Sequence, residues 1–222
     1  MLKDLPVKTL AFKNLCVEGY SRAAVQTYWR IPELKIGFDL GAQPWSFMGT
    51  PTWFVSHTHI DHVAALPAYV ARRRMMRMEP PVIYLPEAAI DPVQRLLRLV
   101  SRLDRGRLPC TLRPLRPGDE VELSRELVVT VSATRHTVPS LGFVVWERRR
   151  KLKPEYSGLT GEQIRDLRLG GVEVTRETRI ARVAYLGDSA PEGLDACPAM
   201  YEAEVLILEV TFVAPNHRKE RI

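Results

Sequence analysis

The chain has 222 residues, and its 32 lysines and arginines against 26 aspartates and glutamates give a formal net charge of +6. A hydrophobic fraction of 45% and a charged fraction of 26% are those of an ordinary globular protein, which argues against a disordered, collagen-like or coiled-coil chain. Three widely separated cysteines disfavour a disulfide framework or a cysteine zinc site, and no apolar run reaches the length of a signal peptide or a membrane span, so we expect a soluble, cytoplasmic protein without membrane contact.

Seven short runs rich in β-branched and aromatic residues predict strands. Helical patterns separate some of them, at residues 63–71, at residues 91–105 and after Thr160, where Gln163 gives the spacing of a capping box. This mixture predicts an α/β fold in one domain covering residues 1–222, because no repeat, low-complexity tract or long linker interrupts the chain. The predicted strands are residues 35–40, 53–56, 82–85, 127–132, 142–146, 182–186 and 205–209.

The helix at residues 91–105 has the clearest pattern of the three. Asp91 is expected to cap it and Pro92 to occupy its first position. Apolar residues at helical spacing form one stripe, and four arginines recur on another face. The stripe consists of Val93, Leu96, Leu97, Val100 and Leu103, and the basic face of Arg95, Arg98, Arg102 and Arg105.

Three of the five histidines lie within six residues, in the sequence H-T-H-I-D-H that starts at His57. The motif follows a predicted strand, where His57 and His59 face the same side of extended backbone. Asp61 and His62 fall at the turn into the next helix and can point into the same cavity. Imidazole nitrogens and carboxylate oxygens suit zinc and similar divalent ions. Unrelated surface or core histidines are the alternative, but four potential ligands at one strand end are a poor way to build a core.

His136 and Asp188 fit the same pocket. Each follows a predicted strand, and the carboxyl ends of strands are where α/β folds place their ligands. Taken alone, His136 would be interpreted as a surface residue and Asp188 as part of a turn. Their occurrence together with the histidine motif favours a shared site.

The chain resembles the metallo-β-lactamase superfamily and, within it, ribonuclease Z, the endonuclease that removes the 3′ trailer of precursor tRNA. The likeness to the short form of plants and cyanobacteria is carried by H-T-H-I-D-H, by P-S-L-G after His136 and by G-D-S around Asp188. It extends over nearly the whole chain and includes F-D-L-G at residues 38–41, L-P-A-Y-V-A at 66–71, K-L-K-P-E-Y-S-G-L at 151–159 and E-V-T-F at 209–212.

This resemblance implies an αβ/βα sandwich that binds two zinc ions and a protein that is usually a homodimer. Asp61 would also orient or deprotonate the attacking water, and Glu209 would belong to a proton relay with a later histidine. The first ion would be held by His57, His59 and His136, the second by Asp61 and His62, and Asp188 would bridge the two ions.

The chain departs from the family pattern at its C-terminal end. In the family, a histidine well beyond E-V-T-F completes the second metal site, and the relay histidine also comes from that region. Here the chain ends at Ile222, and the one remaining histidine, His217, has basic and polar neighbours typical of a surface position. We therefore expect an incomplete sandwich and a second zinc site that lacks one ligand. A truncated chain, a partner chain that supplies the missing part, and a degenerate member of the family all remain open, and truncation is favoured.

Basic residues form three clusters that could bind RNA phosphates. The alternative is that they are solvated faces. The four tryptophans are expected to pack in the core or in loops rather than to stack on bases. The clusters are Arg72, Arg73, Arg74 and Arg77; Arg95, Arg98, Arg102 and Arg105; and Arg148, Arg149, Arg150, Lys151 and Lys153, the last within the segment where ribonuclease Z enzymes insert a tRNA-holding arm.

The favoured hypothesis is a zinc-dependent endoribonuclease that acts on precursor tRNA. A metallo-β-lactamase-fold hydrolase of a small phosphodiester, lactone or thioester is the second hypothesis. The third is an inactive RNA-binding relic whose metal site performs no chemistry.

Overall fold

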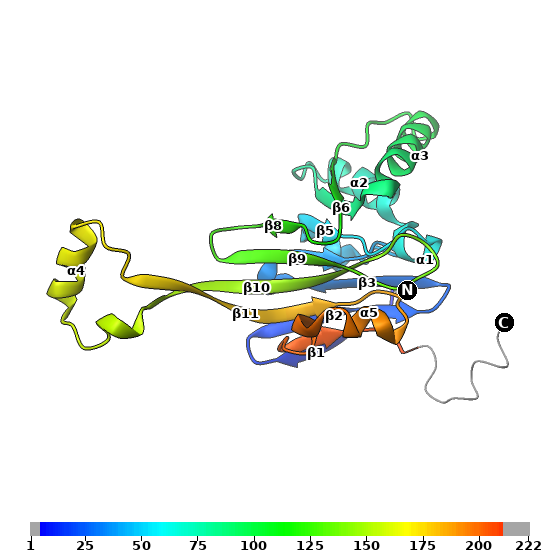
Figure 1. The fold of residues 1–222 in the computed structure, drawn as a ribbon. Helices are drawn as coiled ribbons and strands as arrows, with labels where there is room; N and C mark the ends of the chain where they lie inside the picture. The colour runs from blue at the N-terminus through cyan, green and yellow to red at the C-terminus, as the bar shows by residue number, and fades with distance from the viewer. Residues whose placement is uncertain (1–4, 211–222) are drawn as a thin grey trace.

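The computed structural model describes residues 5–210, whose strands form two sheets (Figure 1). The first sheet has seven strands in chain order, and the second has five in the order β12-β11-β10-β9-β8. The strands of the first sheet are β1 (Lys8–Phe12), β2 (Leu15–Arg22), β3 (Gln26–Ile31), β4 (Ile36–Phe38), β5 (Thr52–Phe54), β6 (Val82–Pro86) and β7 (Thr111–Leu115). Those of the second are β8 (Glu120–Glu122), β9 (Leu127–Ala133), β10 (Leu141–Leu152), β11 (Thr175–Tyr185) and β12 (Val205–Ile207).

Helices cover the outer faces of the two sheets. The outer face of the first sheet packs on α2 (Leu66–Met75) and α3 (Ile90–Leu103), which follow the short helix α1 (Ile60–Val63). The outer face of the second sheet packs on residues around α5 (Pro191–Asp195). The order of layers is helix, sheet, sheet, helix, which confirms the predicted α/β sandwich. None of the described helices is long and apolar enough to cross a membrane.

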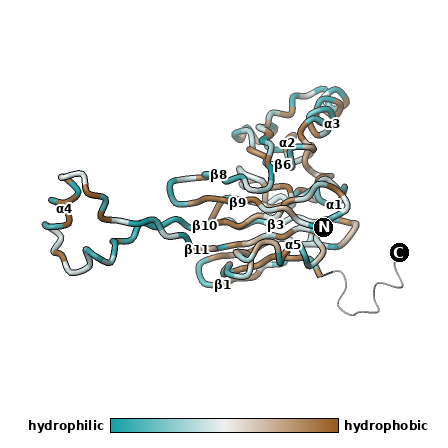
Figure 2. The backbone as a smooth tube through the Cα atoms, viewed as in Figure 1, coloured by the Kyte–Doolittle hydropathy of each residue, from teal (hydrophilic) through white to brown (hydrophobic). Residues whose placement is uncertain are grey.

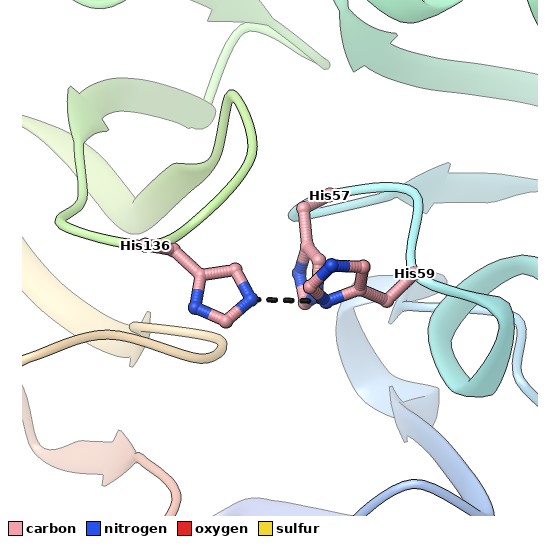
Figure 3. A group of neighbouring side chains, drawn as sticks. All are labelled: His57, His59 and His136. Atoms are coloured by element: carbon pink, nitrogen blue, oxygen red, sulfur yellow. Dashed lines mark hydrogen bonds between the residues drawn. The ribbon is translucent and has the colours of Figure 1, made fainter.

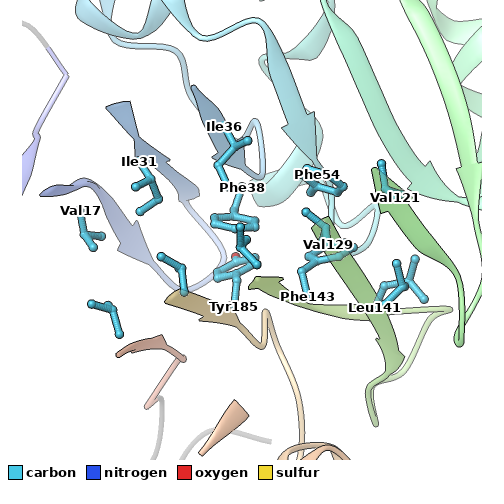
Figure 4. Close-up of a cluster of buried hydrophobic side chains, with 14 of the residues drawn as sticks. Val17, Ile31, Ile36, Phe38, Phe54, Val121, Val129, Leu141, Phe143 and Tyr185 are labelled. Atoms are coloured by element: carbon cyan, nitrogen blue, oxygen red, sulfur yellow. The ribbon is translucent and has the colours of Figure 1, made fainter. Parts of the chain in front are cut away.

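Aliphatic and aromatic side chains fill the space between the sheets (Figure 4). Phe38 from the first sheet stacks on Tyr185 from the second, with ring centroids 4.8 Å apart, and Phe54 lies 5.3 Å from Phe143. Neighbouring residues alternate between layers, as period-two geometry requires: Phe54 enters this inter-sheet core, whereas Trp53 faces the helices. The alternation explains why both faces of β5 are apolar.

Two strands of the second sheet are much longer than the sequence analysis predicted. β10 and β11 leave the sandwich as a two-stranded ribbon that carries α4 (Gly161–Leu169) near its tip (Figure 1). We call residues 147–180 the arm. Figure 2 shows hydrophilic residues along the ribbon, in contrast to the hydrophobic sandwich. The predicted strand 142–146 ended too early and the predicted strand 182–186 began too late, because the outer halves of β10 and β11 cover no core and lack an apolar alternation.

Several sequence-based predictions of local structure need correction. Strands β1, β2, β3, β7 and β8 were not predicted, and β1 is exposed along its whole length. Helix α3 is capped at Ala89 rather than at Asp91, which instead pairs with Arg95 at 2.9 Å in the first turn. Pro92 is correspondingly the third helical residue. The capping box of Thr160 and Gln163 at the start of α4 is confirmed.

The apolar stripe and the basic face of α3 also differ from expectation. Val93 and Leu97 are buried, but Leu96, Leu99 and Leu103 are exposed, with 78% of Leu103 accessible. Arg105 lies beyond the helix, in a left-handed conformation with φ of 48°. The helix therefore touches the sheet along a narrower line than its sequence suggests.

Candidate metal centre

Three segments meet at the edge of the sandwich where β5, β9 and β11 end. These segments are residues 55–59 after β5, residues 134–140 between β9 and β10, and residues 186–190 after β11. Backbone hydrogen bonds join them: the Leu141 N–H donates to the Ser56 carbonyl, and the Ala190 N–H donates to the Arg135 carbonyl, both at 2.9 Å. The segments that carry the predicted ligands are thus tied to one another directly.

Three histidines from two of these segments face one another (Figure 3). His59 Nδ1 lies 3.1 Å from His57 Nε2 and 3.0 Å from His136 Nε2. One ligand atom from each ring lies within 4.8 Å of the others. We call His57, His59 and His136 the three-histidine group.

The spacing of these nitrogens is compatible with a bound metal ion as well as with hydrogen bonds between the rings. A neutral imidazole has one donor and one acceptor, so three rings whose nitrogens converge on one point cannot satisfy one another fully. Zinc–nitrogen bonds of about 2.0–2.1 Å in a tetrahedron place neighbouring ligand atoms roughly 3.3 Å apart. The observed separations of 3.0 and 3.1 Å are close to that value. The donor set therefore suits a divalent ion.

His57 belongs to a second group as well, with His62 and Asp188. We call His62 and Asp188, together with His57, the His62–Asp188 group. His62 Nε2 lies 3.2 Å from Asp188 Oδ1 and 3.7 Å from Asp61 Oδ2. Asp61 thus borders this group, and its Oδ2 accepts a hydrogen bond from the Ala24 N–H at 2.9 Å. All six predicted ligands consequently lie at one place.

Helix α1 returns the chain to the site. His59 precedes the helix with extended backbone, and the His62 N–H donates to its carbonyl at 2.9 Å. The Leu40 N–H in turn donates to the His62 carbonyl at 2.7 Å, which anchors α1 to the loop after β4. This tight turn explains how His57 and His62, five positions apart, reach the same site.

Asp39 supports both groups, although the sequence analysis assigned it no role. It is fully buried, and its Oδ2 accepts a hydrogen bond from His62 Nδ1 at 2.7 Å. The Ser56 hydroxyl also donates to Oδ2, at 2.9 Å, and lies 3.0 Å from His57 Nδ1. Both contacts leave the Nε2 atoms of His57 and His62 directed toward the ligand groups, as outer hydrogen bonds do in metal sites. The signal in the sequence for such a role is an aspartate placed between apolar residues at the end of a strand.

The surroundings shift the pKa values of His57 and His62 in opposite directions. Burial, with the nearby His62 charge, lowers the pKa of His57 to about 4, so this ring is neutral and offers a lone pair. Burial also opposes a charge on His62, but the Asp39 and Asp188 carboxylates outweigh it and raise the pKa of His62 to about 10. A metal ion at His62 Nε2 would replace that proton. Burial likewise lowers the pKa of His136.

Glu209 lines a narrow crevice together with Tyr185 and Asp188. It is half-buried, close to the ligands but outside both groups. His217, the other residue considered for this end of the site, lies outside the described residues.

The predicted RNA-binding residues lie on two separate elements. Arg95, Arg98 and Arg102 are exposed on α3, and Arg150 and Lys151 are exposed on the arm. Other basic residues of the arm have partners: Arg148 pairs with Glu122 at 2.9 Å, and Arg149 with Glu147 at 2.5 Å. Lys153 is half-buried.

One prediction about the remaining basic residues is wrong. Arg73 is buried and donates to the carbonyls of Glu79 and Met48, so it stabilises a turn rather than offering charge to RNA. Of the tryptophans expected in the core or in loops, Trp45 is 59% exposed with the Arg72 guanidinium 5.9 Å from its ring, so it lies at the surface. Trp53, in contrast, is fully buried as expected.

A hollow of about 510 Å³ opens beside the three-histidine group. Its wall includes His136 together with Glu87 and Arg116, which form an ion pair. A second hollow, of about 320 Å³ and mostly apolar, lies between α1, α3 and the loop of Val138 and Pro139. The His136 side of the three-histidine group therefore borders concave surface that is open to solvent.

The chain matches the family model described as a beta-lactamase superfamily domain over residues 52–221. It is 41% identical to the nuclear ribonuclease Z of Triticum aestivum over 166 residues, which cover 75% of this chain and 94% of that protein. It is 34% identical to tRNase Z TRZ1 of Arabidopsis thaliana over 93% of this chain and 74% of that protein.

The chloroplastic tRNase Z TRZ2 of Arabidopsis thaliana is also 34% identical, over 96% of this chain, and the chain spans 61% of its length. Among solved structures, the human short-form tRNase Z superposes with a TM-score of 0.51 at 18% identity, over 92% of this chain and 74% of that one. This structural likeness concerns the fold. The sequence relatives and the family model show that the chain belongs to the metallo-β-lactamase superfamily and, within it, to the ribonuclease Z family.

Proposed function

We propose that this chain is a zinc-dependent endoribonuclease that removes the 3′ trailer of precursor tRNA. The observation that carries the proposal is the convergence of His57, His59, His136, His62 and Asp188 in a chain of the ribonuclease Z family. The relatives' names supply the substrate class, and the two ligand groups supply a chemical means of hydrolysing a phosphodiester.

The two groups would hold two zinc ions. The three-histidine group would bind one ion, and His62 with Asp61 would bind the other. Asp188, whose carboxylate contacts His62, would bridge them. Bound divalent ions acidify a coordinated water and neutralise charge on phosphate oxygens. The protein's own contribution is to fix the imidazole nitrogens and carboxylates in place, which the buried Asp39 supports.

Two carboxylates would transfer or orient protons. Asp61 Oδ2 lies 3.7 Å from His62 Nε2 and is held by the Ala24 N–H, so it could accept a proton from the attacking water. Glu209, in the crevice beside Asp188, would belong to the relay that protonates the leaving oxygen. The hollow bordered by His136 and Arg116 would receive the RNA next to the scissile phosphate.

Two basic surfaces would bind the rest of the substrate. The exposed arginines of α3 and the exposed Arg150 and Lys151 of the arm would contact phosphates, because guanidinium and ammonium groups supply sequence-independent affinity. Arg148 and Arg149 would instead order the base of the arm through their ion pairs.

We further propose that the chain forms a homodimer. The exposed Leu96, Leu99 and Leu103 share one side of α3 at helical spacing, and a second copy would cover this apolar strip. Light scattering coupled to gel filtration should give twice the mass of 25.3 kDa, whereas a single-chain mass at micromolar concentration would contradict the dimer.

The decisive experiment compares two substrates with zinc-loaded protein. Precursor tRNA with a labelled 5′ end should be cut at the 3′ end of the acceptor stem, and His59→Ala should lose this cleavage. Bis(p-nitrophenyl) phosphate is the matched small ester. Turnover of the ester without cleavage of the tRNA would contradict the proposal and support a small-molecule hydrolase. Binding of tRNA without cleavage of either substrate would support an inactive RNA-binding protein.

A further inference from the structure

Tyr185 links the second sheet to the metal centre. It is the last residue of β11, it is buried, and its hydroxyl donates a hydrogen bond to Asp39 Oδ2. Asp39 follows β4 of the first sheet, so this bond crosses the interior of the sandwich. No role in metal binding follows from the family motifs for a tyrosine at this position.

The bond completes a set of four donors around one carboxylate. Asp39 Oδ1 accepts from the Ser56 N–H at 2.7 Å. Oδ2 accepts from the Ser56 hydroxyl at 2.9 Å, from His62 Nδ1 at 2.7 Å and from Tyr185. Three of these donors share Oδ2, which has two lone pairs, so this oxygen is fully occupied. Each one restricts the orientation that the carboxylate can take.

Tyr185 itself cannot move easily. Its ring stacks on Phe38 with centroids 4.8 Å apart, and Phe38 is the residue directly before Asp39. Burial and the adjacent Asp39 charge raise the pKa of Tyr185 well above its usual value, so the phenol stays protonated and remains a donor. The hydroxyl is therefore a fixed donor at Asp39 Oδ2.

The same oxygen orients His62. Because Asp39 Oδ2 receives His62 Nδ1, the imidazole presents Nε2 to Asp188, 3.2 Å away. Asp188 follows Tyr185 by three residues, across Gly187 with its left-handed φ of 67°. Tyr185 is thus connected to His62 through the hydrogen-bonded Asp39 carboxylate and to Asp188 through a short stretch of backbone.

We propose that Tyr185 is a positioning residue whose hydroxyl holds Asp39 in the orientation that presents His62 to the metal ion shared with Asp188. The inference rests on the proposed function only in that the two groups bind metal. Loss of the hydroxyl leaves the stacked ring in place but frees one side of Asp39, so His62 becomes less well ordered. Outer partners of metal ligands typically contribute 10–100-fold to metal affinity. Since Tyr185 acts through Asp39, we expect a loss at the lower end, about tenfold.

The test measures zinc affinity by competition with a chelator in two single-site backgrounds. His59→Ala disables the three-histidine group, and His62→Ala disables the His62–Asp188 group. Adding Tyr185→Phe to His59→Ala should weaken zinc binding about tenfold. Adding it to His62→Ala should change the affinity less than about twofold, because Asp39 reaches the three-histidine group one step further away, through the Ser56 hydroxyl that lies 3.0 Å from His57 Nδ1. This split separates positioning from general destabilisation, which would weaken both groups alike.

Tyr69→Phe is the matched control. Tyr69 is also fully buried, and removing its hydroxyl likewise breaks a donated hydrogen bond, to the Thr50 carbonyl, together with one accepted from Arg73 at 3.4 Å, away from both ligand groups. It should leave zinc affinity unchanged in both backgrounds. Equal losses from Tyr185→Phe in the two backgrounds, no loss in either, or the same pattern from Tyr69→Phe would each overturn the inference.

A measurement on the unmutated protein guards against misfolding of the variants. Zinc should shift the NMR signals of the Tyr185 ring at the stoichiometry that fills the His62–Asp188 group and should leave those of Tyr69 in place; unshifted Tyr185 signals would overturn the inference. Failure of the unmutated protein to bind zinc would instead refute the proposed function, so the two failures are distinguishable.

Discussion

Replacement of Gly41 by alanine should disrupt the metal centre by pushing α1 away from the loop that follows β4. A Cβ atom at Gly41 would lie 1.7 Å from the Asp61 carbonyl oxygen and 2.6 Å from the Thr27 amide nitrogen. Both are backbone atoms, so no side-chain rotation relieves the overlap. To reach ordinary contact distance, α1 and the loop would have to separate by roughly 1.5 Å. Overpacking of this kind costs about 3 kcal/mol of unfolding free energy.

The displaced helix carries Asp61 and His62, so zinc affinity should fall with stability. A misplacement of about 1 Å can cost 10²-fold in rate, and we expect a comparable loss of metal-dependent turnover. Urea unfolding of the metal-free protein and chelator competition measure the two effects. Gly49→Ala is the matched control, because nothing lies within 4 Å of a Cβ there. If Gly41→Ala behaved like Gly49→Ala in both assays, the close approach of α1 to the loop would be wrong.

Three further predictions concern the core, the protons and the RNA. Phe143→Ala, in the inter-sheet core, should lower the unfolding free energy by about 3–5 kcal/mol in urea titrations, and a loss below about 1 kcal/mol would argue against that packing. Because the pKa of His62 is about 10 without metal, zinc binding near pH 7 should release a proton from it and tighten as pH rises toward 10. Calorimetry in buffers of different ionisation enthalpy measures the number of protons released, and release of no proton would contradict this prediction. Arg98→Ala should weaken binding of precursor tRNA and reduce the slope of log affinity against log salt by about 0.7–0.9, while ester turnover stays unchanged; equal losses on both substrates would exclude a role in RNA binding.

The two candidate ligand groups could be predicted from the sequence because His, Asp, Glu and Cys are the usual ligands of zinc and similar ions, and here such residues are concentrated at strand ends. His57, His59 and His62 share one short motif, and His136 and Asp188 each follow a recognisable apolar strand. The convergence of these residues could therefore be predicted without knowing how the core packs. Asp39 differs because its role depends on which donors surround it, and those come from Ser56, His62 and Tyr185 on distant parts of the chain.

Features that depend on exposure could not be predicted in the same way. The outer halves of β10 and β11 cover no core, so no alternation of apolar residues marks them as strands. Arg73 and its neighbour Arg72 look alike in sequence, yet one is buried against carbonyl groups and the other lies beside an exposed Trp45. Leu103 continues the apolar stripe of α3, but it lies beyond the part of the helix that packs on the first sheet and is exposed.

The central claim is that side chains from three segments hold two metal ions side by side. A crystal of this protein grown with zinc, measured at the zinc absorption edge, tests it most directly. We predict two anomalous peaks, one among His57, His59 and His136 and the other between His62 and Asp188. A single peak, or peaks away from these five side chains, would contradict the claim.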